Sequence, residues 1–436
     1  MNYIWVNRTL TTGILTLFFG TTSVADSNNE FKESFELVWN TINERFYDAG
    51  FNGVDWIDSK KRFGPLVSGA ENEDAFHVQI NTMLFELGVS HLGVVPSDDP
   101  EQLGEAAIFG EGTVGIEVRF LNESLLITHV AESSSAKKHG LSPGNEILSL
   151  NGQTINEIKK ERLEFKTPPF TERNERYNVL QEVYWELMGP VEDKVLVGYM
   201  DNNGQAREAL LDRQKKSASV VFDEGLPPTY VTFEARHLSD KVGYLRFNSF
   251  HPELLDDLAD AMERFADTEG LIIDLRGNPG GAFGVRHQLA SRFVTERSVI
   301  WNYRGRGGID RIYLEPTEWP YTGNLVIIVD GFCASSSEEF SGGLQFMGRA
   351  TIVGEQTPGR DLVSDITVLP TGSYFVFPVA ETRTVDGTVL EHRGIIPDVE
   401  VTFTEEDLKA GRDTQLETAL EVLAATDTLD RHAPPV

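Results

Sequence analysis

Three consecutive serines, Ser335, Ser336 and Ser337, stand in the stretch DGFCASSSEEF at residues 330–340. A serine hydroxyl can attack a carbonyl carbon once a neighbouring base takes its proton, so each serine is a candidate nucleophile for acyl transfer. Cys333 lies two residues before Ser335 and is a second kind of candidate, because a thiolate is a strong nucleophile. A triple serine also fits an ordinary loop or helix N-terminus. The residue types alone leave this choice open.

The serines lie where a strand is expected to turn into a helix. The run GNLVIIVDG at residues 323–331 is typical of a buried strand, and a helix is expected from Ser336 to Met347. A hydroxyl at this junction can face a cleft, while the backbone N–H groups of the first helical turn remain free. The glycine-rich turn in LIIDLRGNPGGA adds the N–H of Gly281. Such donors can hold a developing oxyanion.

The same alternation of strands and helices predicts the fold class. Residues 206–425 alternate continuous apolar strands with helices, which predicts an α/β core with a mainly parallel sheet covered on both faces. Residues 26–104 are expected to form an N-terminal helical domain, since Phe35, Val38, Ile42 and Phe46 recur at helical spacing. Residues 426–436 are expected to be a flexible tail.

The N-terminus has the features of a secretory signal at residues 1–25. Arg8 is its only charge, an apolar run covers residues 10–19, and Ser23 and Ala25 form a small-x-small cleavage site. The apolar run is too short to span a membrane. We therefore expect a periplasmic or secreted mature chain without a membrane span.

The composition argues against several kinds of partner. The chain has 68 acidic and 38 basic residues and a formal charge of −30, whereas nucleic-acid binding requires clustered cations. Cys333 is the only cysteine, so no internal disulfide can form. No spacing of His, Cys, Asp and Glu is typical of a metal site. We expect no metal and no other cofactor, and the oligomeric state stays open.

Residues 105–205 resemble a PDZ domain. The stretches GTVGIEVRF and AKKHGLSPGNEILSLNG carry the strands, helix and turns of that fold. The resemblance implies that Gly115 and Ile116 form a loop whose backbone N–H groups bind a chain-terminal carboxylate. A bound peptide would add as a strand to the edge of the sheet.

The segment CASSSEEFSGGLQFMGRATIVGEQTPG at residues 333–359 resembles the nucleophile region of the C-terminal processing peptidase superfamily. That superfamily includes tricorn core proteases and the interphotoreceptor retinoid-binding proteins. LIIDLRGNPGGA and EHRGIIPDVEV resemble further family motifs, and with the PDZ-like segment the resemblance covers most of residues 85–402. It implies a crotonase-like core, Ser335 as the nucleophile, and the N–H groups of Gly281 and Ser336 as the oxyanion donors.

The base is less obvious, because the lysine of many superfamily members is missing. That lysine follows the nucleophile by 25 residues, and this position holds Arg360. Arginine stays protonated and cannot accept the serine proton. Beyond residue 217 the only lysines are Lys241, at the start of a strand, and Lys409, in a charged C-terminal segment. A serine–lysine mechanism is therefore not expected.

A second branch of the superfamily, resembling tricorn, uses a histidine. Its Ser-His pair precedes the PDZ-like domain, as Ser90 and His91 do here, and its glutamate lies near the C-terminal end of the core, as Glu391 does. The resemblance implies that His91 is general base and then general acid, and that Glu391 acts on it through the Ser90 hydroxyl. Glu338 and Glu355 remain alternatives to Glu391.

The resulting expectation is a secreted or periplasmic serine endopeptidase. It would cleave polypeptides near their C-termini, or in unfolded chains, through an acyl-enzyme on Ser335. A non-catalytic binding protein for apolar ligands or peptides is the alternative, because the retinoid-binding members use a similar core. Function depends on the site rather than on the fold. A set of Ser90, His91, Ser335 and Glu391, which a pure binder does not need, favours the enzyme.

Overall fold

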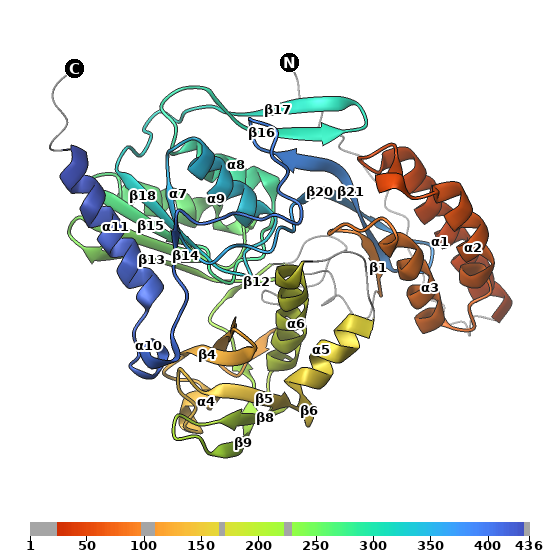
Figure 1. Ribbon diagram of the computed structural model, residues 1–436, viewed down its shortest axis with the longest axis horizontal. Coiled ribbons are helices and arrows are strands. Elements are labelled where there is room, and N and C mark those ends of the chain that lie inside the picture. The colour runs from red at the N-terminus through yellow and green to blue at the C-terminus, as the bar shows by residue number, and fades with distance from the viewer. Residues whose placement is uncertain (1–23, 97–109, 165–170, 222–228, 431–436) are drawn as a thin grey trace, which may run out of the picture.

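The computed structural model describes residues 24–96, 110–164, 171–221 and 229–430. Helices, a small β-rich part and an α/β core follow one another along the chain (Figure 1). The expected signal segment lies outside the described residues as far as position 23.

The N-terminal part consists of α1 (Val24–Arg45), α2 (Trp56–Ser68) and α3 (Glu73–Phe85), with the short turn η1 (Phe51–Gly53). Asp55 and Asn72 cap α2 and α3 by accepting hydrogen bonds from backbone amides, which would otherwise stay unpaired. The apolar side chains of these helices share one buried cluster with Leu362, Phe375 and Phe377 of the core. The helical part is thus fixed to the core by apolar packing.

The PDZ-like part is a sheet in the order β3-β4-β5-β8-β9, with β6 paired to β5. Its strands are β3 (Ile116–Leu121), β4 (Ser124–Val130), β5 (Glu146–Leu150), β6 (Gln153–Thr154), β8 (Lys194–Met200) and β9 (Ala206–Asp212). Its helices are α4 (Ser135–Lys138), α5 (Ile155–Glu164) and α6 (Glu172–Leu187). Strand β9 extends this part past the expected end at residue 205. Only Ala209 and Leu211 of β9 are buried, so its sequence looks like a polar connection.

A small sheet joins the PDZ-like part to the rest of the chain. Strands β2 (Gly112–Thr113), β7 (Met188–Gly189) and β10 (Gln214–Lys215) form it, with β2 in the middle. The chain enters the PDZ-like part through β2 and leaves it through β10. A further pair, β11 (Ser219–Val221) and β12 (Thr229–Val231), leads into the core.

The central sheet of the core has the order β13-β14-β15-β18-β19-β22. These strands are β13 (Phe233–Ser239), β14 (Val242–Phe247), β15 (Gly270–Asp274), β18 (Asn324–Val329), β19 (Thr351–Gly354) and β22 (Val399–Glu400). All neighbours from β14 to β22 are parallel, and β13 is antiparallel at one edge.

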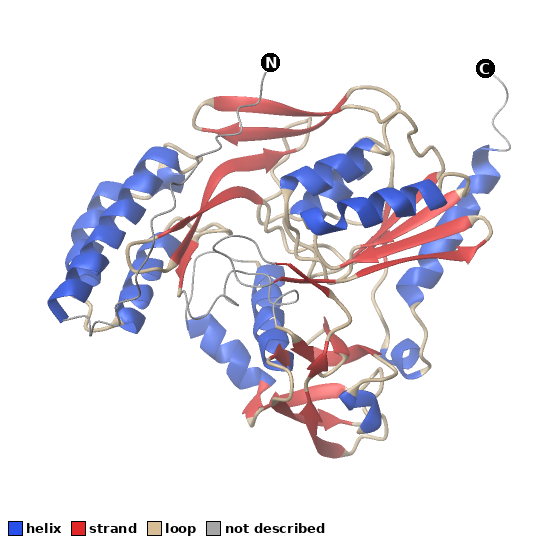
Figure 2. Cartoon of the chain, turned by 180° about the vertical axis from the view of Figure 1, so that it is seen from behind, coloured by secondary structure: helices blue, strands red, loops and turns tan. Residues whose placement is uncertain are grey.

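Helices cover both faces of this sheet (Figure 2). Leu271 and Ile273 of β15 face α7 (Leu255–Arg264), α8 (Phe283–Ser291) and α9 (Ser336–Phe346), whereas Ile272 faces α11 (Thr414–Asp430). This alternation is the one that a strand buried on both faces requires. The predicted doubly covered α/β core is confirmed.

A second, antiparallel sheet was not predicted. It contains β1 (Gly93–Val95), β16 (Ser298–Gly305), β17 (Gly308–Leu314), β20 (Leu362–Val368) and β21 (Tyr374–Arg383). Strand β1 pairs with β21, so residues just before β1 are held against the core. Ser90 and His91 are such residues.

The C-terminus differs from the expectation. Helix α11 continues to Asp430, so residues 426–430 of the expected flexible tail are helical, and residues 431–436 lie outside the described part. Leu416, Ala419, Leu420 and Leu423 pack α11 on the sheet, which stabilises this helix. The short elements η3 (Pro252–Leu254) and α10 (Glu405–Lys409) complete the core. Within the described residues, none of the helices combines the length and apolar character that crossing a membrane requires.

Candidate active site

Ser335 occupies a strained turn between β18 and α9. Its backbone angles are φ 53° and ψ −122°, a region that side-chain-bearing residues rarely adopt. Such strain costs on the order of 1–3 kcal/mol and persists where the surroundings enforce it. Here the Ser335 N–H donates to the Arg360 carbonyl at 2.9 Å. Ala334 and Ser336 are buried, whereas Ser335 is half-buried, so the turn presents this one residue.

The glycine turn of residues 277–281 lies directly against Ser335. A Cβ atom on Gly280 would be 2.8 Å from the Ser335 Cβ and 3.1 Å from the Ser336 nitrogen. Gly281 has φ 132°, and its carbonyl accepts the Ser336 hydroxyl at 2.8 Å. Neither the Gly281 N–H nor the Ser336 N–H donates to an acceptor among the described residues. Both donors are therefore available to a developing oxyanion.

The other nucleophile candidates are already engaged. The Ser337 hydroxyl donates to the Asn278 carbonyl at 2.8 Å, and the Ser336 hydroxyl is held by Gly281. Cys333 is fully buried and its Sγ lies 2.9 Å from the Leu275 carbonyl. Burial raises the pKa of the Cys333 thiol well above its ordinary value, so the reactive thiolate is disfavoured. Cys333 therefore acts in packing.

Ser90, His91 and Glu391 form one chain of hydrogen bonds, although 301 residues separate Ser90 from Glu391. The Ser90 Oγ lies 2.8 Å from His91 Nδ1 and 3.0 Å from Glu391 Oε2. The Ser90 N–H also donates to Glu391 Oε1 at 2.7 Å. The structure thus brings together three residues that the tricorn-like resemblance selects.

This chain of hydrogen bonds determines the histidine tautomer. An ionised Glu391 can only accept, so the single Ser90 hydroxyl proton points to it and the Ser90 oxygen accepts from His91 Nδ1–H. The lone pair of His91 is then on Nε2, the atom that can take a proton. Burial, together with the charge of Arg360, lowers the pKa of His91 to about 3. The imidazole is therefore neutral at ordinary pH.

A single peptide unit connects this chain of hydrogen bonds to Ser335. The Arg360 carbonyl accepts from the Ser335 N–H at 2.9 Å, and the N–H of the same peptide unit, that of Asp361, donates to Glu391 Oε2 at 2.9 Å. The Ser335 turn and the Glu391 carboxylate thus contact the two ends of one peptide group. No spacing signal in the sequence indicates this role, because the residues act through their backbones.

The two alternative glutamates have other surroundings. Glu338 is fully buried and accepts from the N–H groups of Gly359 and Arg360 at 2.8 and 2.9 Å. Burial outweighs these hydrogen bonds and raises the pKa of Glu338 to about 7. It also accepts from the Ser335 N–H at 3.3 Å in a capping box, so it anchors both the start of α9 and the loop before Asp361. Glu355 lies 3.5 Å from the Gln415 amide, and Ser90 and His91 are not among the hydrogen-bond partners that the described residues give it.

The groove of the PDZ-like part is occupied by the core. In this part β3 is the edge strand, and α6 lies beside it. The Val118 N–H donates to the Tyr184 hydroxyl at 3.3 Å, which covers a backbone group that an added peptide strand would use. Phe332, three residues before the nucleophile, stacks on Tyr177 of α6 with ring centroids 4.8 Å apart. In this state the groove holds the nucleophile loop.

The expected carboxylate-binding loop is also engaged. The Gly115 N–H, which the PDZ resemblance assigns to a peptide carboxylate, donates to the Thr113 hydroxyl at 3.1 Å. A Cβ atom at Gly115 would lie 2.2 Å from the Ser134 Cβ, and φ is 83°, so close packing and backbone conformation both require glycine. Ile116 begins β3 and pairs with Val130. A chain end could bind here only after the loop gave up its present contact.

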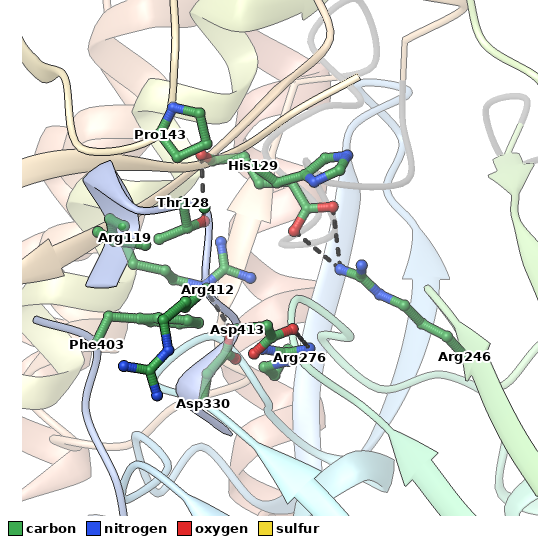
Figure 3. A pocket seen from close by; sticks show the side chains of 13 residues that line it. Arg119, Thr128, His129, Pro143, Arg246, Arg276, Asp330, Phe403, Arg412 and Asp413 are labelled. Carbon is green, nitrogen blue, oxygen red and sulfur yellow. Dashed lines mark hydrogen bonds and ion pairs between the residues drawn. The ribbon is translucent and has the colours of Figure 1, made fainter. Parts of the chain in front are cut away.

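A charged pocket of about 160 Å³ lies where the PDZ-like part meets the core (Figure 3). Its lining does not include the candidate catalytic residues Ser335, His91 and Glu391. Arg119 of β3 pairs with Asp330 in its wall, and Asp330 Oδ1 in turn accepts from the Phe332 N–H at 3.0 Å. These two residues were missed in the sequence, since only the docking of the two parts brings them together.

A second ion pair crosses the same pocket. Glu117 and Arg246 are in contact at 2.9 Å. Burial raises the pKa of Glu117, but Arg246 and Arg119 lower it further, with a net decrease to about 2. The carboxylate therefore stays ionised. Two pairs of opposite polarity on one strand fix the register in which β3 docks.

Comparisons with known proteins agree with this arrangement. Three family descriptions match in chain order: the Tricorn protease C1 domain at residues 27–85, the PDZ domain at 88–167, and Peptidase family S41 at 241–401. The chain belongs to the C-terminal processing peptidase family. The chain is therefore a serine peptidase, and its substrates are polypeptides.

The peptidase resembles named relatives over most of its length. It is 25% identical over 423 residues to the carboxyl-terminal-processing protease of Synechocystis sp.. This alignment covers 93% of the present chain and 90% of the relative. Its fold matches the photosystem II D1 C-terminal processing protease with a TM-score of 0.58 at 22% identity, covering 90% and 97% of the two chains. Mature CPAF matches with a TM-score of 0.64 at 14% identity over 94% and 99%.

Proposed function

We propose that this peptidase is a secreted or periplasmic serine endopeptidase that cleaves polypeptides through an acyl-enzyme on Ser335, with His91 as the base. The observation that carries the proposal is the hydrogen-bonded chain Glu391–Ser90–His91, which backbone contacts connect to the nucleophile turn. Arg360 at the position of the lysine base supports the same choice, because it cannot accept a proton.

The first half of the reaction makes the acyl-enzyme. Ser335 Oγ attacks the scissile carbonyl carbon while its proton passes to His91 Nε2. The negative charge moves to the carbonyl oxygen, where the N–H groups of Gly281 and Ser336 stabilise it. His91, now a cation, is stabilised through Ser90 by Glu391. It then gives the proton to the leaving amine as the C–N bond breaks.

The second half releases the product. A water molecule attacks the acyl carbon and gives one proton to His91, and the oxyanion forms again at the same two donors. When the ester bond breaks, the proton returns from His91 to Ser335 Oγ, and the product leaves as a carboxylic acid that ionises in water. The low pKa of His91 keeps the imidazole unprotonated when the substrate arrives, which is the state that a general base requires.

Labelling with a serine-directed fluorophosphonate tests the proposal. The expected result is one modified peptide containing Ser335, lost in Ser335→Ala together with hydrolysis of a fluorescein-labelled casein. Ser337→Ala is the matched control, because its hydroxyl only holds a carbonyl in the structure. A label on Cys333 or Ser336, or casein hydrolysis by Ser335→Ala, would contradict the assignment of the nucleophile.

Flexible chains, cut near their C-termini, are the substrates proposed. The PDZ-like part supports this by its fold, although its groove must first release Phe332 to accept a peptide strand. Matched peptides with a free C-terminal acid or an amide measure the preference at concentrations well below saturation. Equal cleavage rates for the two peptides would argue against the reading of chain ends.

A further inference from the structure

The backbone of Arg360 contacts several of the candidate catalytic residues, although its side chain cannot transfer a proton. Its N–H donates to Glu338 Oε2 at 2.9 Å, and its carbonyl accepts from the Ser335 N–H at 2.9 Å. The next residue, Asp361, donates its N–H to Glu391. The position of the Arg360 backbone therefore affects both the nucleophile and the carboxylate behind the base.

The side chain of Arg360 binds the PDZ-like part. Its guanidinium lies over the ring of Tyr177, 4.8 Å from the centroid, and Nη1 donates to the Asn178 side-chain oxygen at 3.1 Å. Both partners belong to α6. A planar guanidinium suits such a site, because it can stack and donate a hydrogen bond at the same time.

Helix α6 holds the catalytic loop at further points. The Asn174 side chain donates to the Pro358 carbonyl at 2.8 Å, two residues before Arg360. The Tyr177 ring also stacks on Phe332, three residues before Ser335, with an interplanar angle of 20°. Arg360 and Phe332, from two different loops, thus both contact Tyr177 of α6.

We propose that Arg360 is a positioning residue through which helix α6 of the PDZ-like part holds the catalytic loops in register. The inference rests on the proposed peptidase mechanism. It assigns a function to the residue that replaces the lysine base: Arg360 transfers no proton, and its side chain fixes the backbone that supports Ser335 and Glu391. Movement of α6 would then change the geometry of catalysis without any contact between α6 and the reacting atoms.

The charge of Arg360 supplies an independent readout. Burial first, and the Arg360 charge second, lower the pKa of His91. Loss of that charge raises the pKa of His91, because a nearby cation disfavours the imidazolium. The acid limb of the pH profile should then move upward. A residue with a purely structural effect on folding would lower activity without moving this limb.

The test compares Arg360→Gln, Asn178→Ala and the double variant with Arg176→Gln, which changes a half-buried arginine of α6 that pairs with Glu172. We expect Arg360→Gln to lower kcat on labelled casein roughly tenfold. The midpoint of its fluorophosphonate reaction should also move upward, followed from pH 2 to 8 so that the wild-type His91 pKa of about 3 lies inside the range. Asn178→Ala should lower kcat less, and the double variant no more than Arg360→Gln, because both changes cut one link. Arg176→Gln should match the wild type.

The outcomes separate this inference from the proposed function. Wild-type kcat and an unmoved acid limb in Arg360→Gln, with the wild type labelled at Ser335, would overturn the inference and leave the peptidase proposal standing. A wild type without label at Ser335 would overturn both. If Arg360→Gln loses thermal stability, Asn178→Ala decides, since it keeps the charge. An unchanged kcat in Asn178→Ala would contradict the link to α6.

Discussion

Replacing Ser90 by alanine tests whether the hydrogen bonds from Glu391 to His91 act as a relay. The Ser90 hydroxyl lies 2.8 Å from His91 Nδ1 and 3.0 Å from Glu391 Oε2. When His91 takes the nucleophile's proton it becomes a cation, and this hydroxyl connects the cation to the carboxylate. Alanine removes the connection and leaves Glu391 its backbone donors at Ser90 and Asp361.

The size of the effect follows from the charge on His91. A hydrogen bond to a charged group is worth about 1.5–3 kcal/mol, and each 1.36 kcal/mol changes a rate about tenfold. We therefore expect kcat to fall roughly 10- to 150-fold. KM should change little, because the cation forms only after the substrate is bound.

The assay is casein hydrolysis at pH 7.5 under saturating substrate. Ser34→Ala is the matched control, since Ser34 is a fully buried serine of α1 whose hydroxyl lies 3.5 Å from the Thr371 hydroxyl. Both variants lose one buried hydroxyl, so thermal unfolding should be similar. A kcat of Ser90→Ala within twofold of that of Ser34→Ala would refute the relay.

Three further changes give separate tests. Glu391→Gln should lower kcat roughly 10²- to 10⁴-fold. The glutamine amide can donate to the Ser90 oxygen, so the Ser90 hydroxyl then donates to His91 Nδ1 and the imidazole proton is on Nε2. A smaller loss of kcat than in Ser90→Ala would contradict this tautomer argument. Gly281→Ala should lower kcat roughly 100-fold or more and lower the melting temperature, since its Cβ would lie 2.7 Å from a backbone carbonyl oxygen at φ 132°. Gly284→Ala, with open space around its Cβ, should change neither kcat nor the melting temperature. Equal effects of the two substitutions would refute the geometric reason. Burial raises the pKa of Glu355 from 4.5 to about 7, so between these values the folded state holds a proton that the unfolded state releases, and stability falls as pH rises through this window. Melting temperatures at pH 5 and pH 8 should therefore differ less in Glu355→Gln than in the wild type. If the difference between the two temperatures is the same in both proteins, Glu355 does not contribute to the pH dependence of stability.

Much of the central sheet could be predicted because its strands are buried on both faces. Leu271, Ile272 and Ile273 are all fully buried although they alternate between two helical layers. Such strands appear as continuous apolar runs. The second sheet has half-exposed strands, and Ile309 of β17 and Ile366 of β20 are exposed. Its hydrophobic pattern is therefore too weak to separate strands from loops.

The candidate site could be predicted where a short motif or the tricorn-like resemblance indicates a residue, as it does for Ser90, His91 and Glu391, which the structure brings together. Ser335 and Gly281 stand in short segments with a recognisable family pattern, and the charge of Arg360 excludes it as a base. The contact between Arg119 and Asp330 spans 211 residues and depends on how two separately folded parts dock. Neither hydrophobic period nor residue type contains that information.

The pairing of β2 with β10 has an evolutionary consequence. Thr113 lies opposite Gln214, and Gly112 opposite Lys215, so the entry and exit of the whole inserted part are neighbours in space. Recombination could therefore replace the PDZ-like part by joining two neighbouring points of the chain, without changing the path of the chain through the core. A replacement domain would still have to cover the ring of Phe332 and pair with the charge of Asp330. The sequence of the face that points away from the core can therefore change with new substrates. The face that contacts Phe332 and Asp330 is constrained by its packing on the core.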